Sequence, residues 1–206
     1  MQPNVTKCKY MPFFRGTRVI YTYFIDNVAL DSVDTFIDLG VTMDPKLKFS
    51  VHIDTVISKA NCLLGFIKRW AKEFRDPYTT KALFISLVRP ILEYASVVWC
   101  PYYGYYVDSI ESVQKQFLLF ALRSLRWSSN FVLPPYENRL KLINLPTLRH
   151  RRTIANVLFI HKLLNGFVYS LFLLSCLFFK VPTRCSRFYY PVNLVPCETN
   201  YMDLEP

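Results

Sequence analysis

The amino-acid sequence predicts a mainly α-helical chain that begins with a short β-hairpin. Two observations carry this prediction. From residue 50 onward, apolar residues recur at helical spacing over long segments. Before residue 45, short runs of β-branched and aromatic residues alternate with turn residues. We therefore expect extended structure first and a helical bundle after it.

The hairpin is predicted over residues 19–30. The run VIYTYFI (19–25) has the composition of a strand, Asp26-Asn27 is a turn pair, and residues 28–30 supply the second strand. Upstream, KYMPFF (9–14) contains a proline and can form at most an edge strand. Residues 36–41 form a further short extended piece.

The first two helices have recognisable starts. Ser50 is the expected cap of a helix that runs to about Phe74. Asp76-Pro77 combines an N-cap residue with proline at the first helical position, so a second helix starts there and runs to about Trp99. Pro90 is expected to kink or end that helix near Val88. Trp70 and Trp99 lie on the apolar stripes, which places both in the expected core.

Three more helices complete the expected bundle. They run from Asp108 through Arg126, between Pro134-Pro135 and Leu145-Pro146, and from 148 to 165 behind a Thr147 cap, ending at Asn165-Gly166. The tail from residue 180 holds four prolines and is expected to be irregular.

Composition and charge exclude some classes and favour others. Of the 206 residues, 52% are hydrophobic and 17% aromatic, which excludes intrinsic disorder. The net charge is +10, and residues 61–160 carry most of the excess, with fourteen basic and six acidic residues. A basic helical segment favours an anionic partner such as nucleic acid. An acidic membrane surface is a weaker competitor.

The cysteines and the apolar segments bear on the compartment. No two of the six cysteines are spaced as CxxC, and the first ten residues contain no apolar signal segment. Reduced thiols in an intracellular, non-secreted protein are the simplest interpretation. The longest apolar run, residues 167–179, has 13 residues, short of the roughly 20 that span a bilayer. We expect it to be buried in the protein.

Motifs for nucleotide or metal chemistry are absent from the sequence. It contains no GxGxxG, no GxxxxGK[ST] and no HExxH. The densest acids, Asp31, Asp34, Asp38 and Asp44, have a spacing that suits turns and caps better than a metal site. His52 precedes an apolar stripe and is expected to act as a cap or packing residue.

Basic residues near aromatic ones are the more informative pattern. Arg149, Arg151 and Arg152 cluster in sequence, and Arg123 and Arg126 precede Trp127. Such groups suit phosphates and stacked bases. The alternative is that Lys and Arg complement the C-termini of helices on a solvated surface.

The order of several short motifs resembles one family. Residues 38–44 read DLGVTMD, followed by Leu47-Lys48-Phe49 and His52-Ile53. Downstream come LGFIKR (64–69), VRPILEYASVVW (88–99), IESVQ (110–114) and the LxxLxxRR pattern of Leu145 to Arg152. Each motif is short, but together they resemble the non-LTR retrotransposon reverse transcriptases, the jockey-like and related LINE elements, from about residue 4 to 195.

The resemblance implies an organisation. Residues 1–45 correspond to the end of the palm with its β-hairpin, which supports the primer end in that family. Residues 46–166 correspond to a thumb-like helical domain, and 167–206 to an apolar segment and a Pro-containing tail. Residues 167–172, FVYSLF, are more apolar than a connection in that family would require, which is consistent with the decay of a transposon relic.

The resemblance also implies what is missing. Lys7 matches the lysine thought to assist pyrophosphate departure, but the family's metal-binding carboxylates lie upstream of the matched region. We therefore expect a truncated RNA-directed DNA polymerase, without activity alone. Mg²⁺ is expected only in an intact enzyme, and no cofactor is expected on this chain.

The expected partners are RNA or an RNA–DNA duplex, and a missing palm and fingers or another protein. The expected nucleic-acid-binding residues are Lys68, Arg69, Arg123, Arg126, Arg149, Arg151 and Arg152. Two alternatives stay open. One is a helical module that binds protein or membrane with no nucleic-acid role. The other is an open reading frame that yields no stable protein.

Overall fold

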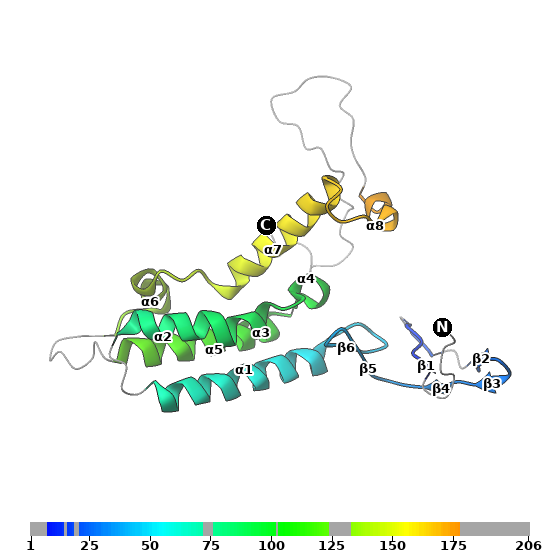
Figure 1. The fold of residues 1–206 in the computed structure, drawn as a ribbon, viewed down its shortest axis with the longest axis horizontal. Coiled ribbons are helices and arrows are strands. Elements are labelled where there is room, and N and C mark those ends of the chain that lie inside the picture. The colour runs from blue at the N-terminus through cyan, green and yellow to red at the C-terminus, as the bar shows by residue number, and fades with distance from the viewer. Residues whose placement is uncertain are drawn as a thin grey trace, which may run out of the picture. The chain divides into compact units, whose positions relative to one another are not determined.

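The computed structural model describes residues 8–14, 16–18, 21–71, 76–101, 103–123 and 133–177 (Figure 1). The described chain is mainly helical, with short strands near its N-terminus, which confirms the predicted fold class. It divides into two compact units, Met1–Arg149 and His150–Pro206. This boundary lies at the start of the last long helix, whereas the sequence predicted boundaries after residues 45 and 166.

Short strands pair two by two in the N-terminal region. β2 (Phe24–Ile25) and β3 (Val28–Ala29) form the predicted hairpin, and Asp26 and Asn27 turn it with positive φ angles of 48° and 61°. β5 (Phe36–Asp38) and β6 (Val41–Met43) form a second hairpin. β1 (Lys9–Tyr10) pairs in parallel with β4 (Asp31–Ser32), so KYMPFF does contribute a short strand before its proline.

The first helix, α1 (Ser50–Trp70), begins differently from the prediction. Phe49 is the N-cap residue, in the left-handed conformation, and Ser50 is already helical. The side chain that acts here is Asp44, whose Oδ1 accepts a hydrogen bond from the Phe49 N–H at 2.9 Å. This bond holds the turn before the helix, as the spacing of Asp44 suggested, but no side chain caps the first turn of α1, so the prediction of Ser50 as the cap is wrong.

The second helical segment starts where Asp76-Pro77 predicted. α2 (Pro77–Leu83) is capped by Asp76, whose carboxylate accepts the N–H groups of Tyr78 and Thr79. These hydrogen bonds lower the Asp76 pKa, because they stabilise the charged form.

Pro90 alters the register of this segment instead of ending it. A π-helical turn, η2 (Phe84–Val88), precedes α3 (Arg89–Glu93), and the Arg89 N–H reaches the Phe84 carbonyl five residues back. The chain then forms the short α4 (Ser96–Trp99).

The three later helices that the sequence predicted are all present. α5 (Gly104–Ala121) starts four residues earlier than Asp108 suggested. α6 (Tyr136–Ile143) and α7 (Leu148–Leu164) follow as predicted. Gly166, at a φ of 74°, ends α7, and the Phe167 N–H bonds back to the Lys162 carbonyl.

One hydrophobic core holds the first unit together. α1 packs on α5 and on α3, and the Phe84 and Phe117 rings stack with centroids 4.2 Å apart. The apolar residues at helical spacing along α5 and at its C-cap are buried, namely Ile110, Val113, Phe117, Leu118, Ala121 and Leu122. The described core also includes Ile53, Val56, Ala60, Leu64 and Ile67 of α1.

A polar junction fastens the second hairpin to the bundle. His52 Nδ1 accepts a hydrogen bond from the Thr42 N–H at 3.2 Å, and the His52 ring packs edge-on against Trp99, with centroids 5.3 Å apart. Trp99 is 1% exposed and donates its Nε1–H to the Tyr94 carbonyl. The Tyr94 hydroxyl donates to the Leu39 carbonyl in the hairpin turn. His52 is thus a packing and hydrogen-bonding residue, as expected.

The apolar run near the C-terminus departs from its prediction. α8 (Leu171–Ser175) forms within it, yet Phe167, Tyr169 and Phe172 are 78%, 81% and 76% exposed. The expectation of burial is therefore wrong for its described part, residues 167–177. No helix among the described residues combines the length and apolar character needed to cross a membrane.

Candidate nucleic-acid interface

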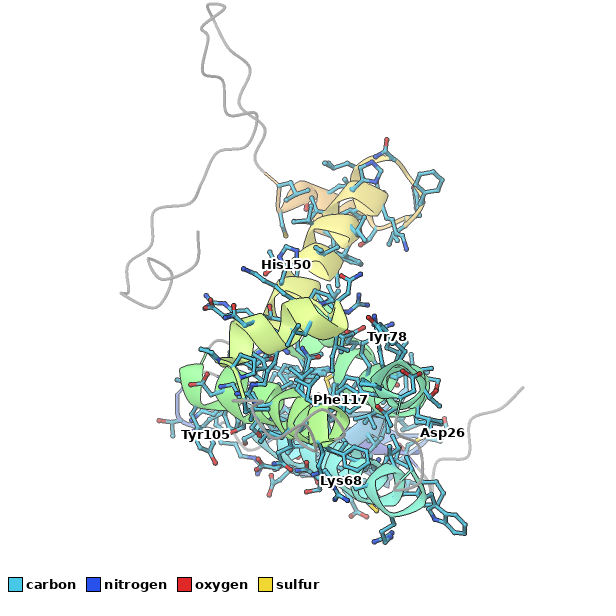
Figure 2. All side chains as sticks on the ribbon, turned by 90° about the vertical axis from the view of Figure 1, so that its left-hand side faces the viewer. Asp26, Lys68, Tyr78, Tyr105, Phe117 and His150 are labelled. Atoms are coloured by element: carbon cyan, nitrogen blue, oxygen red, sulfur yellow. The ribbon has the colours of Figure 1, made fainter. Side chains whose placement is uncertain are left out.

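The C-terminal turn of α1 presents a cationic and aromatic surface. Ile67 and Ala71, each 1% exposed, fix the inner face of this turn against the core. The residues between them therefore point sideways or outward: Lys68 is half-buried, and Arg69 is exposed. Trp70 is 72% exposed. Lys68, labelled in Figure 2, lies on the outside of α1 at this end.

A further cation follows the C-terminus of α5 at the same end of the bundle. His52, near the start of α1, contacts Trp99, which lies just before the start of α5. The two helices are in contact and run in the same direction, so they end at the same side of the bundle (Figure 1). Arg123 follows the buried Leu122 and is exposed. Lys68, Arg69 and Arg123 are here called the basic end.

The electrostatics of the basic end have two components. The C-terminus of a helix carries a partial negative charge, which nearby cations stabilise. Two helices end here, so part of the positive charge is offset internally. Within the part of the chain that the structure describes, Lys68, Arg69 and Arg123 form no salt bridge. The carboxylate of Asp76 is engaged by the backbone of α2. Among the described residues, these cations are therefore neutralised by no carboxylate.

The arginines around the start of α7 form a separate group. The Glu111 carboxylate on α5 accepts hydrogen bonds from the N–H groups of Leu148 and Arg149, at 3.2 and 3.3 Å. Glu111 precedes Ala121, the last residue of α5, by ten residues, which is about 15 Å along a helix axis. Within the first unit, Arg149 therefore does not form one patch with the basic end.

The members of this group differ in exposure. Arg149 is exposed and Arg151 is half-buried. Arg152 is 3% exposed, which favours a structural role over contact with a phosphate. Lys7 and Arg126 lie outside the described residues.

The Glu111 carboxylate is the centre of a buried polar cluster. Glu111 is 7% exposed and accepts the hydroxyl hydrogen of Tyr136 as well as the two α7 N–H groups. Burial and this hydrogen bond to a carboxylate raise the Tyr136 pKa, because both disfavour the phenolate. Gln114 donates to the Pro146 carbonyl at 2.9 Å. The IExVQ motif thus holds the start of the LxxLxxRR segment by hydrogen bonds.

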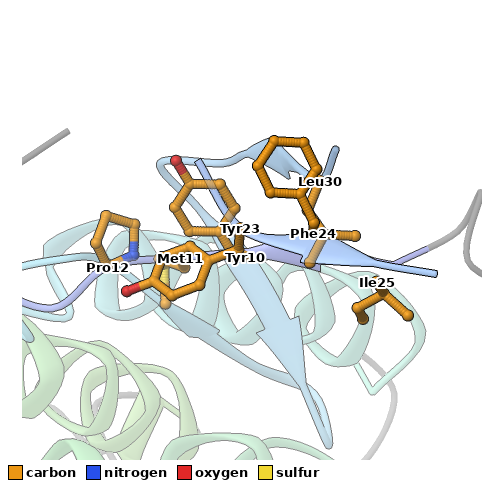
Figure 3. A pocket seen from close by; sticks show the side chains of 7 residues that line it. All are labelled: Tyr10, Met11, Pro12, Tyr23, Phe24, Ile25 and Leu30. Carbon is orange, nitrogen blue, oxygen red and sulfur yellow. The ribbon is translucent and has the colours of Figure 1, made fainter. Parts of the chain in front are cut away.

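The N-terminal hairpin lies beside a concave surface. A shallow apolar hollow of about 320 Å³ lies beside it, lined by Tyr10, Met11, Pro12, Tyr23, Phe24, Ile25 and Leu30 (Figure 3). The Tyr10 hydroxyl donates to the Tyr21 carbonyl, and the Tyr10 and Tyr23 rings pack edge to face with their centroids 4.8 Å apart. In the same N-terminal region, Arg18 pairs with Asp34 at 2.8 Å.

Trp70 is the residue that sequence reasoning misplaced. It was expected in the core because it stands three residues after Ile67, at helical spacing. Its position at the edge of the α1 stripe was the available signal, since Lys68 flanks the stripe on the other edge. The Trp70 ring contacts Phe66, with centroids 5.8 Å apart, and Phe66 is itself 44% exposed.

Comparison of the chain with protein-family models, curated proteins and solved structures gave no match.

Proposed function

We propose that this chain is the C-terminal part of a non-LTR retrotransposon reverse transcriptase, comprising the end of the palm and the thumb. In this role it contacts the template–primer duplex through phosphates and has no polymerase activity by itself. The observation that supports the proposal most is the agreement between the resembling motifs and the contacts they make.

The motifs meet one another at two places. DLGV, His52 and LEYASxVW come together where Tyr94 bonds the Leu39 carbonyl and His52 contacts Trp99. IExVQ and LxxLxxRR come together where Glu111 receives the Leu148 and Arg149 N–H groups. The matched segments thus belong to one packed unit, as they would have to if they descended together from one protein.

The basic end supports the nucleic-acid part of the proposal. A thumb holds duplex through its sugar–phosphate backbone, which requires cations without base-specific geometry. Lys68 and Arg69 provide such cations in the last turn of α1, and Arg123 provides one just after the end of α5. The hairpin beside the apolar hollow is the part that corresponds to primer support in the family.

Two assays test this proposal. Binding to an RNA–DNA hybrid should weaken steeply as salt rises, because phosphate contacts release counterions. Absence of binding at low salt would remove the nucleic-acid role. Primer extension with Mg²⁺ should show no incorporation, since the sequence lacks the family's upstream carboxylate motif. Robust incorporation by the purified chain would contradict the proposed inactivity.

One observation favours the alternative of an interaction module. Apolar side chains on α7 and beyond it are exposed, including Val157 at 60%, Leu171 at 66% and Phe172 at 76%. Contiguous exposed apolar surface marks protein or membrane contact. Self-association or liposome binding that persists in high salt, without hybrid binding, would favour this alternative over the first.

A further inference from the structure

We propose that Trp70 stacks on an unpaired base, so that the basic end binds nucleic acid carrying a single-stranded segment more tightly than blunt duplex. This inference rests on the proposed function and specifies its ligand. It adds a residue that no motif pointed to, and it is argued from exposure, position and charge.

The first step is the exposure of the ring. A tryptophan that is 72% exposed leaves most of its apolar surface in water. Isolated exposed apolar residues are ordinary, but Trp70 is not isolated, because Phe66 lies against it and is also exposed. Together they form a small aromatic surface on the flank of the last two turns of α1.

The second step is the charge around this ring. Arg69, the neighbour of Trp70 in sequence, is exposed and supplies the charge beside the ring, whereas Lys68 lies on the other flank of α1. Among the described residues neither forms a salt bridge. A docking protein with an acidic surface would satisfy the cations, but it would not need an accessible indole ring. A nucleotide satisfies both, since it joins a flat π surface to a phosphate within one residue.

The third step separates unpaired from paired bases. Aromatic rings stack on bases irrespective of sequence, but they need access to the face of the base. In a continuous duplex the neighbouring pairs cover these faces. A ring on the outside of α1 therefore gains stacking only from an overhang or a strand end. Cations that bind phosphates do not distinguish unpaired from paired bases.

The experiment compares two ligands with the full chain at low salt. The ligands are an oligo-dT single strand and a blunt RNA–DNA hybrid with the same number of phosphates. The variants are Trp70→Ala, Trp70→Phe and, as control, Tyr105→Ala. Tyr105 is 73% exposed on the first turn of α5, at the opposite end of that helix from Arg123. Thermal unfolding verifies that each variant is folded.

The expected result is selective. Trp70→Ala weakens oligo-dT binding by roughly tenfold, within the range known for base–aromatic stacking, and leaves hybrid binding nearly unchanged. Oligo-dT quenches tryptophan emission in the original chain, and Trp70→Phe removes most of this quenching while it retains most of the affinity. Tyr105→Ala changes neither ligand's affinity.

Other results overturn the inference in distinguishable ways. If the original chain binds both ligands and Trp70→Ala binds each of them as tightly as the original chain does, the stacking role is wrong and the proposed function stands. If Trp70→Ala weakens both ligands to the same extent, preference for unpaired bases is wrong. If the original chain binds neither ligand, the proposed function itself fails.

Discussion

The charged side chain that meets the start of α7 and the charged side chains at the end of α1 have opposite environments. Glu111 is buried, and three donors from other parts of the chain converge on its carboxylate. Lys68 and Arg69 stand at a helix end and form no salt bridge among the described residues. A buried charge with convergent donors fixes structure, because removing one partner leaves the other buried polar groups without a hydrogen bond. Unengaged surface charges add little to stability and can serve a ligand.

This difference predicts that substitutions in the buried junctions change stability, whereas substitutions at the basic end change binding. Variants in each region test this distinction. The largest effects on unfolding are expected at the hairpin junction and the smallest at the basic end.

Replacing Trp99 should have the largest effect. Trp99→Ala removes a fully buried ring that contacts His52 and leaves the Tyr94 carbonyl without its indole donor. The free energy of unfolding should fall by roughly 3–5 kcal/mol. Urea denaturation measures it, and Val98→Ala, next to it but 52% exposed, is the control. Equal decreases for the two variants would show that the junction is not specially stabilising.

Removing the charge of Glu111 should have the next largest effect. Glu111→Gln keeps the shape but replaces a carboxylate that accepts the N–H groups at the start of α7 and the Tyr136 hydroxyl. The free energy of unfolding should fall by roughly 1–3 kcal/mol. Glu137→Gln is the control, because Glu137 is exposed in the first turn of α6. A Glu111→Gln variant as stable as the control would show that the buried polar cluster does not stabilise the fold.

The sequence predicted the apolar framework better than these junctions. The stripes of α1 and α5 and the start at Asp76-Pro77 depend on local spacing, and the structure confirms them. Glu111 could be seen as part of a motif, but its role needs Leu148 and Tyr136, far along the chain. Trp70 was misjudged because a residue at the edge of a stripe can face either way. The side chains at 167–172 were expected to find a buried site, yet they are largely exposed.

The hairpin junction should also respond to pH. Burial, and to a lesser extent the charge of Lys59, lowers the His52 pKa from its ordinary value of 6.5. The unfolded chain thus binds a proton at a higher pH than the folded one. The contribution of His52 to stability is complete above pH 6.5, and it disappears as pH falls towards the lowered pKa. Protonation would also remove the Nδ1 acceptor that holds the Thr42 N–H.

Unfolding measured as a function of pH checks this expectation. His52→Asn offers an oxygen acceptor that does not titrate, so its stability should depend less on pH in this range, even if removal of the imidazole ring lowers stability throughout. His161→Gln removes an exposed histidine in the last turn of α7 and should keep the original pH dependence. A His52→Asn variant with the original slope would show that another group is responsible.

The basic end should show the smallest effect on stability and a distinct effect on binding. Lys68→Gln with Arg69→Gln removes two cations from the last turn of α1. Their interaction with the helix C-terminus contributes at most about 1 kcal/mol each. Hybrid binding should weaken, and the slope of log affinity against log salt should become shallower by about 0.9 for each phosphate that the variant no longer neutralises.

Lys59→Gln, an exposed cation in the middle of α1, is the control for this pair of substitutions. If Lys59→Gln reduced the salt slope as much per charge removed, binding would follow net charge, and the end of the bundle would have no special role. A reduced slope confined to Lys68 and Arg69, with stability unchanged, would instead assign these two cations to the phosphate backbone.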